Sequence, residues 1–206
     1  MSSASSTARL VAAAAVGYLL GTVPSADVAA RLAHGGTIDL RASGSNNPGA
    51  LNAAQQLGTR WGVAVLIADA MKGSAAGVIG KRIAGGTGAY AAATLSIAGH
   101  IWPMWSRFRG GKGVATSAGA CLAIFPAYFP IDAGVAALGA VGSRNAETSV
   151  RVSAAVWTLS AALWWRRGWP NLWGPRPTAG LPMFAAVSSA MIVVKFASAR
   201  RTAATG

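Results

Sequence analysis

The residues best suited to chemistry lie in a glycine-rich turn around a lysine, Gly110-Gly111-Lys112-Gly113. Glycine lets the backbone adopt positive φ angles, so successive N–H groups can turn toward one bound anion. We expect a helix from Val114, whose N-terminal end would add positive potential. Lys112 and Arg109 add full charges, so the turn predicts an anion site. The alternative is a basic turn at a membrane edge that binds no ligand, and the Walker A pattern GxxxxGKS/T is not satisfied.

A second glycine-rich loop covers residues 41–52, which read RASGSNNPGALN. It fits neither a helical nor a strand period, and its glycine, proline, asparagine and serine content is typical of turns. Alone, such a stretch is more often a plain connector. Two polar loops predicted on one membrane face favour a shared site.

Composition indicates a membrane protein. The 206 residues are 53% apolar and only 11% charged, whereas an ordinary soluble domain carries about 25% charged residues. The net charge of +13 would suit nucleic acid, but the basic residues lie at the ends of apolar runs, as in membrane proteins. We therefore expect membrane lipids as partners and no nucleic acid. The single Cys121 excludes a disulfide framework, and we expect no metal site.

Seven apolar segments make up most of the chain, and each is expected to be helical. They are residues 10–32, 60–83, 87–107, 113–129, 131–142, 149–166 and 181–198. The prediction is an all-α fold, a polytopic membrane helix bundle of about seven transmembrane helices. It forms a single integral-membrane domain over residues 1–206, with residues 1–7 disordered.

The loop charges predict the orientation. If residues 33–59, 107–112, 143–148 and the C-terminus share one side, that side holds most of the arginines and lysines. Cytoplasmic loops of membrane proteins carry such an excess. Both glycine-rich loops are therefore expected at the cytoplasmic face.

Polar residues inside the apolar segments need partners, because each is costly in a bilayer. Asp27 and Arg31 are four residues apart and can pair on one helix face, and Asp69 and Lys72 are three apart. His100 ends the third segment just before the basic turn. Its position favours a functional role or a role in bracing that turn.

Four patterns occur in a fixed order along the chain. Residues 41–52 match R-x-x-G-S-G-N-x-G-A-T-N, and an aspartate followed by a Lys-Gly pair is found at Asp69 and Lys72-Gly73. G-H-x-x-P and then F-K-G-G-K-G-V-A-T match residues 99–103 and 108–116, with one lysine replaced by arginine. Together these elements resemble the bacterial acyl-phosphate:glycerol-3-phosphate acyltransferases, the PlsY family, over about residues 17–120.

The resemblance implies an inner-membrane enzyme with cytoplasmic active-site loops. Its reaction moves a fatty acyl group from acyl phosphate to the 1-hydroxyl of glycerol 3-phosphate, yielding 1-acyl-glycerol 3-phosphate and phosphate without a metal or cofactor. Ser45 and Lys112 are the implied catalytic residues. The implied substrate-binding residues are Gly44, Asn47, Gly49, Asn52, Lys72, His100, Arg109, Gly110, Gly111, Gly113, Thr116, Ser143 and Arg144.

The chain also departs from the family pattern. Asn46, Leu51 and Gln55 stand where the family has glycine, threonine and arginine. The family's C-terminal H-R-x-N-I-x-R-L-x-x-G-x-E is absent, and the chain ends KFASARRTAATG. Two alternatives therefore stay open: a weak or inactive relative that binds phospholipid precursors, and a small anion transporter.

Overall fold

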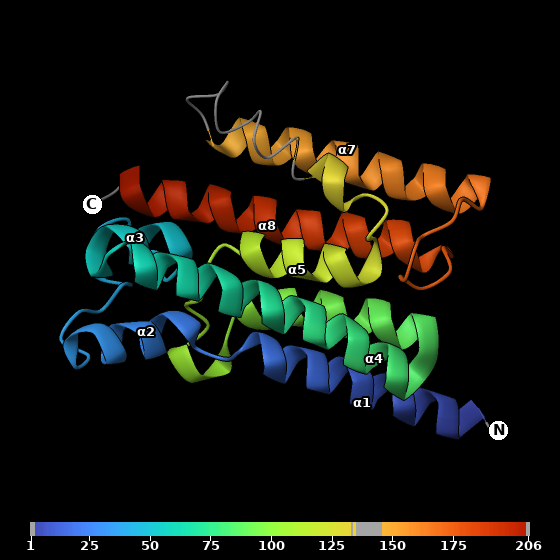
Figure 1. Cartoon of the computed structure of the whole chain (residues 1–206), viewed down its shortest axis with the longest axis horizontal. Helices are drawn as coiled ribbons and strands as arrows, with labels where there is room; N and C mark the ends of the chain where they lie inside the picture. Colours follow the sequence, from blue (N-terminus) through green and yellow to red (C-terminus); the bar gives the residue numbers. More distant parts are fainter. Residues whose placement is uncertain (1–2, 133, 135–145, 205–206) are drawn as a thin grey trace.

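The computed structural model describes residues 3–132, 134 and 146–204. Every regular element within them is a helix, which confirms the all-α prediction (Figure 1). The elements are α1 (Ser3–Gly21), α2 (Ser25–His34), α3 (Ala50–Leu57), α4 (Thr59–Ile101), η1 (Met104–Ser106), α5 (Val114–Ile124), α7 (Ala146–Arg167) and α8 (Gly180–Ala204). The segment predicted at 131–142 lies mostly outside the described residues.

The sequence predicted one helix for the first apolar segment, but the structure has two. The break falls at Thr22–Pro24, between α1 and α2. Proline has no N–H to donate and clashes with the preceding turn, so a helix does not run through it without disruption. α1 also begins at Ser3, so the expectation that residues 1–7 are disordered is wrong from that residue onward.

α4 contains the second and third predicted segments, folded into a helical hairpin. The helix is interrupted at Ala84 and Gly85, where Gly85 has φ 64° and ψ −153°. This backbone conformation is open to almost no residue but glycine. The two halves then pack backbone to backbone, since a Cβ atom at Gly80 would lie 2.4 Å from the carbonyl oxygen of Gly88.

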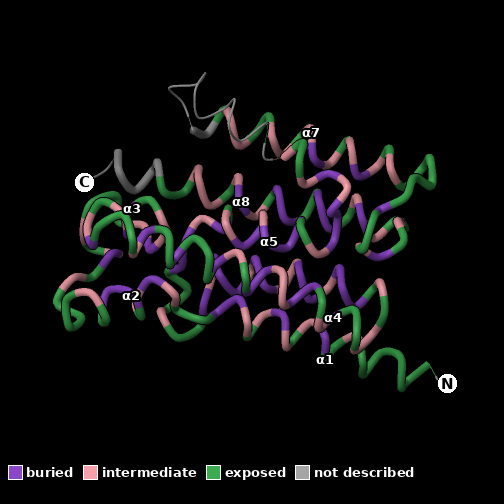
Figure 2. The backbone as a smooth tube through the Cα atoms, viewed as in Figure 1, coloured by how far each residue is buried: buried purple, intermediate pink, exposed green. Residues whose placement is uncertain are grey.

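Small residues bring the remaining helices close to this hairpin, as is usual in membrane bundles. α1 packs along the second half of α4, and α5 packs along the first half. A Cβ atom at Gly119 of α5 would lie only 1.8 Å from the carbonyl oxygen of Ala70. An apolar core that includes Ile97, Ile124 and Phe184 joins α4, α5 and α8. Figure 2 shows the buried residues along these inner faces.

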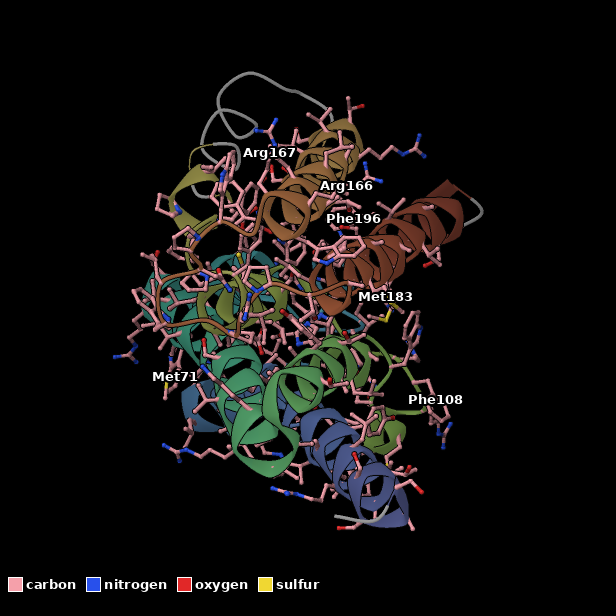
Figure 3. The ribbon with its side chains drawn as sticks, turned by 90° about the vertical axis from the view of Figure 1, so that its right-hand side faces the viewer. Met71, Phe108, Arg166, Arg167, Met183 and Phe196 are labelled. Carbon is pink, nitrogen blue, oxygen red and sulfur yellow. The ribbon has the colours of Figure 1, made fainter. Side chains whose placement is uncertain are left out.

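Three segments among the described residues are long and apolar enough to cross a membrane: Ser3–His34, Thr59–Ser106 and Gly180–Ala199. Their outward side chains are apolar as well. Met71 of α4 and Met183 of α8 are 65% and 66% exposed, and they project from opposite sides of the bundle (Figure 3). Exposed apolar side chains of this kind are suited to contact with lipid.

One end of the bundle gathers the short elements. α2, α3, η1 and the C-terminal end of α8 lie together there, and the N-terminus of α1 lies at the opposite end (Figure 1). The two glycine-rich loops therefore share one end, as predicted. Its cytoplasmic location stays a prediction.

Replacing Gly119 by alanine should destabilise the protein by roughly 1–3 kcal/mol, because the new methyl group meets the backbone of α4. The direction of this stability change is informative, because replacing a helical glycine by alanine otherwise stabilises a helix by about 1 kcal/mol. Gly86→Ala is the matched control, because its Cβ atom would meet nothing closer than Pro175 at 3.6 Å. Unfolding titrations in mixed micelles measure both variants; equal stability of the two would contradict this packing.

Candidate active site

A cavity of about 240 Å³ lies at the end of the bundle that carries the two loops. Its walls come from the α1–α2 junction, α2, both halves of α4 and the segment 103–111. Across one lip, the indole N–H of Trp105 donates to the hydroxyl of Thr22 at 3.0 Å. The ionisable lining residues are Asp27, Arg31, Arg41, Asp69, Lys72 and His100. Positive groups outnumber carboxylates, so the cavity is suited to an anion.

The Asp69 carboxylate organises the base of the cavity. It is 2% exposed, and one of its oxygens lies 2.9 Å from Nζ of Lys72 and 3.6 Å from Nδ1 of His100. This confirms the predicted pairing with Lys72. Lys72 also donates to the carbonyl of Val23 at 3.1 Å, at the break between α1 and α2. One carboxylate thus ties together both halves of α4 and, through Lys72, the first helix.

Arg41 connects the two loops. Its Nε donates to the carbonyl oxygen of Arg109 at 2.8 Å, and its guanidinium forms an ion pair with Asp27 of α2. The planar fork of arginine suits such a double contact, which lysine would not reproduce. The predicted pairing of Asp27 with Arg31 is therefore wrong. Asp27 pairs with Arg41, and Arg31 lines the cavity.

The sequence predicted that the glycine amides of the basic turn would be free to face an anion, but two of the three are engaged within the protein. The N–H groups of Gly110 and Gly111 donate to the carbonyls of Ile101 and His100, each at 3.1 Å. They satisfy carbonyls that the end of α4 leaves unpaired. Glycine is needed for space: a Cβ atom at Gly111 would lie 2.3 Å from Nε2 of His100. His100 therefore braces this turn, as its position suggested.

Lys112 turns away from the lining of the cavity and toward α8. Its Nζ lies 4.5 Å from the centre of the Phe196 ring, a cation–π contact. Partial burial lowers the pKa of Lys112, because a charged ammonium loses solvation there. A bound anion beside it would favour the charged form.

The first loop is organised by Asn52, which is 1% exposed. Its amide oxygen accepts the N–H of Ser45 at 3.0 Å, and its amide nitrogen donates to the carbonyls of Leu40 and Ser43 at 3.0 and 2.9 Å. The side chain predicted to bind substrate is thus occupied in holding the loop. Ser45 itself is exposed at the loop surface.

Apart from Asn52 in α3, the predicted site residues fall in four places. Lys72, His100, Gly110 and Gly111 line the cavity. Gly44, Ser45, Asn47, Gly49, Arg109 and Lys112 lie in the loops at the same end, while Gly113 and the buried Thr116 begin α5. Ser143 and Arg144 lie outside the described residues.

Three charged residues of the cavity, Asp27, Arg31 and Arg41, were not predicted as site residues from the sequence. Signals for them existed. Asp27 and Arg31 are charges in an apolar segment, and Arg41 is the first residue of the first loop pattern. A charge inside a membrane segment indicates a functional site by default.

Comparison with known proteins identifies the relatives of this chain. The profile of the family described as glycerol-3-phosphate acyltransferase matches residues 11–206. The chain is 34% identical over 189 residues to the glycerol-3-phosphate acyltransferase of Allorhizobium ampelinum, a match that covers 90% of this chain and 82% of that protein. It is 43% identical over 111 residues to glycerol-3-phosphate acyltransferase 2 of Moorella thermoacetica. That match covers 54% of this chain and only about half, 56%, of the relative.

A solved structure shares the fold. The crystal structure of PlsY (YgiH), an integral membrane glycerol 3-phosphate acyltransferase in its glycerol 3-phosphate form, superposes with a TM-score of 0.74. The similarity covers 96% of this chain and 92% of the other, at 25% identity. The family match over nearly the whole chain and the shared membrane fold lead to one conclusion. The chain belongs to the glycerol-3-phosphate acyltransferase family and is an integral membrane protein.

Proposed function

We propose that this protein transfers a fatty acyl group from acyl phosphate to the 1-hydroxyl of glycerol 3-phosphate. The products are 1-acyl-glycerol 3-phosphate and inorganic phosphate. The observation that carries the proposal is the cavity itself. It is lined by Arg31, Arg41 and Lys72 at one end of an apolar bundle, and the relatives of the chain are named glycerol-3-phosphate acyltransferase.

The cavity is suited to substrates with a charged head and an apolar tail. Its lining includes Val23, Val28 and Trp105, which are exposed apolar side chains beside the cations. A phosphate group can lie against the cations while an acyl chain leaves along these side chains toward lipid. Both properties are found together in acyl phosphate.

The reaction needs charge stabilisation and positioning more than a covalent intermediate. The glycerol hydroxyl oxygen forms a bond to the acyl carbonyl carbon, the bond from that carbon to the phosphate oxygen breaks, and the hydroxyl proton is released. Negative charge grows on the carbonyl oxygen and on the departing phosphate, and nearby cations stabilise both. Holding two phosphorylated molecules in one small space supplies much of the remaining rate.

Two residues outside the cavity lining complete the proposed site. Lys112 contributes a cation for the glycerol phosphate from the side of α8. Ser45 contributes a hydroxyl from the first loop, where it can hold a phosphate or the carbonyl oxygen as charge develops. The contact of Arg41 with the Arg109 carbonyl supports this assignment, because it holds the two loops together. In this proposal the site faces the cytoplasm, as the loop charges predict.

The purified protein in lipid nanodiscs, given palmitoyl phosphate and glycerol 3-phosphate, should release phosphate and form lysophosphatidate in equal amounts. Phosphate release by colorimetry and the lipid product by mass spectrometry check this. Omitting glycerol 3-phosphate is the control and should abolish the ester product. Binding of glycerol 3-phosphate without turnover would instead indicate an inactive relative, and anion flux across liposomes would indicate a transporter.

Lys112→Ala should raise the KM for glycerol 3-phosphate, and Ser45→Ala should mainly lower kcat. Loss of one charge-assisted contact corresponds to an effect of about tenfold or more. Steady-state kinetics with each substrate varied in turn separates the two effects. If both variants behave as wild type, the site is misplaced.

Arg41→Lys should reduce kcat/KM by about tenfold or more despite the retained charge, because an ammonium cannot contact Asp27 and the Arg109 carbonyl as a planar fork does. The measurement is kcat/KM for both substrates. Arg82→Lys, a conservative change at the opposite end of the bundle, serves as the control. Full activity of Arg41→Lys would show that the link between the loops is not needed.

A further inference from the structure

α8 presents one face to the basic turn. A Cβ atom at Gly113 would lie 3.4 Å from Cγ1 of Ile192, and the Phe196 ring lies under the Lys112 ammonium at 4.5 Å. Ile192, Lys195 and Phe196 are spaced i, i+3 and i+4, which places them on one helix face. Lys195 is therefore on the face of α8 that contacts the turn, and it is half-buried there.

The charge of Lys195 lies among other positive groups. The helix face of Lys195 packs against the turn that follows Arg109, and Arg41 contacts the Arg109 carbonyl. These two arginines therefore repel the Lys195 charge, which also acts electrostatically on His100. These residues come from the first loop, the basic turn and the end of α4. Lys195 therefore adds a fourth element, α8, to the cavity end.

Two of the three carboxylates at this end are already engaged in ion pairs, and the third, Asp39, is exposed and accepts the backbone N–H of Arg41. Asp27 pairs with Arg41, and Asp69 contacts Lys72 and His100. In the part of the chain that the structure describes, no ion pair joins a carboxylate to Lys195 or Arg109. Like charges held together in a partly buried place repel strongly, and a bound anion would offset this repulsion.

We propose that Lys195 is a further substrate-binding residue, which with Arg41 and Arg109 holds the phosphate group of a phosphorylated substrate. The ligand is a phosphate ester or an acyl phosphate, so this inference rests on the proposed function. The sequence lacks the family's C-terminal motif with its histidine and asparagine. A lysine on α8 supplies a basic group close to that end of the chain.

Steady-state kinetics of Lys195→Met tests the inference in the full-length protein. The KM for one phosphorylated substrate should rise by about tenfold or more, and Lys195→Arg should recover most of the loss because the charge returns. Varying glycerol 3-phosphate and palmitoyl phosphate in turn shows which phosphate Lys195 holds. Arg82→Met, which removes one charge at the opposite end, should leave both KM values unchanged. Unchanged KM values in Lys195→Met would overturn the inference.

A measurement on the wild-type protein needs neither turnover nor a folded variant. Lysines are acetylated with and without glycerol 3-phosphate, palmitoyl phosphate or inorganic phosphate, and the modified sites are mapped by mass spectrometry. At least one of these probes should protect Lys195, and the exposed Lys81 should stay reactive. Protection without any acyl transfer would refute the proposed function and support this inference. Acyl transfer without protection would do the reverse.

Discussion

The buried carboxylate of Asp69 is the interaction on which the site depends. It lies on the first half of α4 and contacts His100 on the second half, so it joins the two arms of the hairpin. It also holds Lys72, whose ammonium reaches the carbonyl of Val23 where the first helix breaks. A buried carboxylate without partners would be very costly. The arrangement is therefore stable only when all of these groups converge, and their convergence forms the base of the cavity.

The shortage of carboxylates also favours an anion at the proposed site. The chain has 18 basic and only 5 acidic side chains. Some of the basic groups lie at the surface near lipid headgroups, where solvent and lipid phosphates compensate them. Those around the cavity are partly buried and share few carboxylates. A phosphorylated ligand is then a suitable counter-ion, because its negative charge would offset the repulsion among these basic groups.

The glycines of the basic turn have hydrogen-bond partners other than the predicted anion. The glycines at positions 110 and 111 were expected to let their backbone N–H groups face an anion. Those amides instead pair with the carbonyls of Ile101 and His100, and the missing side chain at Gly111 leaves room for the imidazole. The anion contacts in the proposed site come from side chains of other elements. Asn52 shows the same pattern, because its amide holds the loop together rather than facing the cavity.

Much of the fold and part of the site followed from the sequence alone. Apolar runs located the helices of α4, α7 and α8, because a membrane segment must satisfy its backbone internally and be apolar outside. The pairing of Asp69 with Lys72 followed from their spacing on one helix. The break at Pro24 was not expected, because small apolar residues continue on both sides of it. The partner of Asp27 was also missed, since Arg41 is brought to it by a loop and not by helix periodicity.

The sequence by itself determined the class of protein, the loops that carry the charges and the residue pairs set by helix geometry. These depend on composition and on contacts within a few residues. Only the tertiary structure decided which charged groups meet which partners: Arg41 meets Asp27 and the Arg109 carbonyl, and Lys112 meets Phe196 of α8. Such contacts join residues far apart in the chain, and they depend on how closely the helices pack. No local sequence pattern specifies how closely two distant helices approach each other.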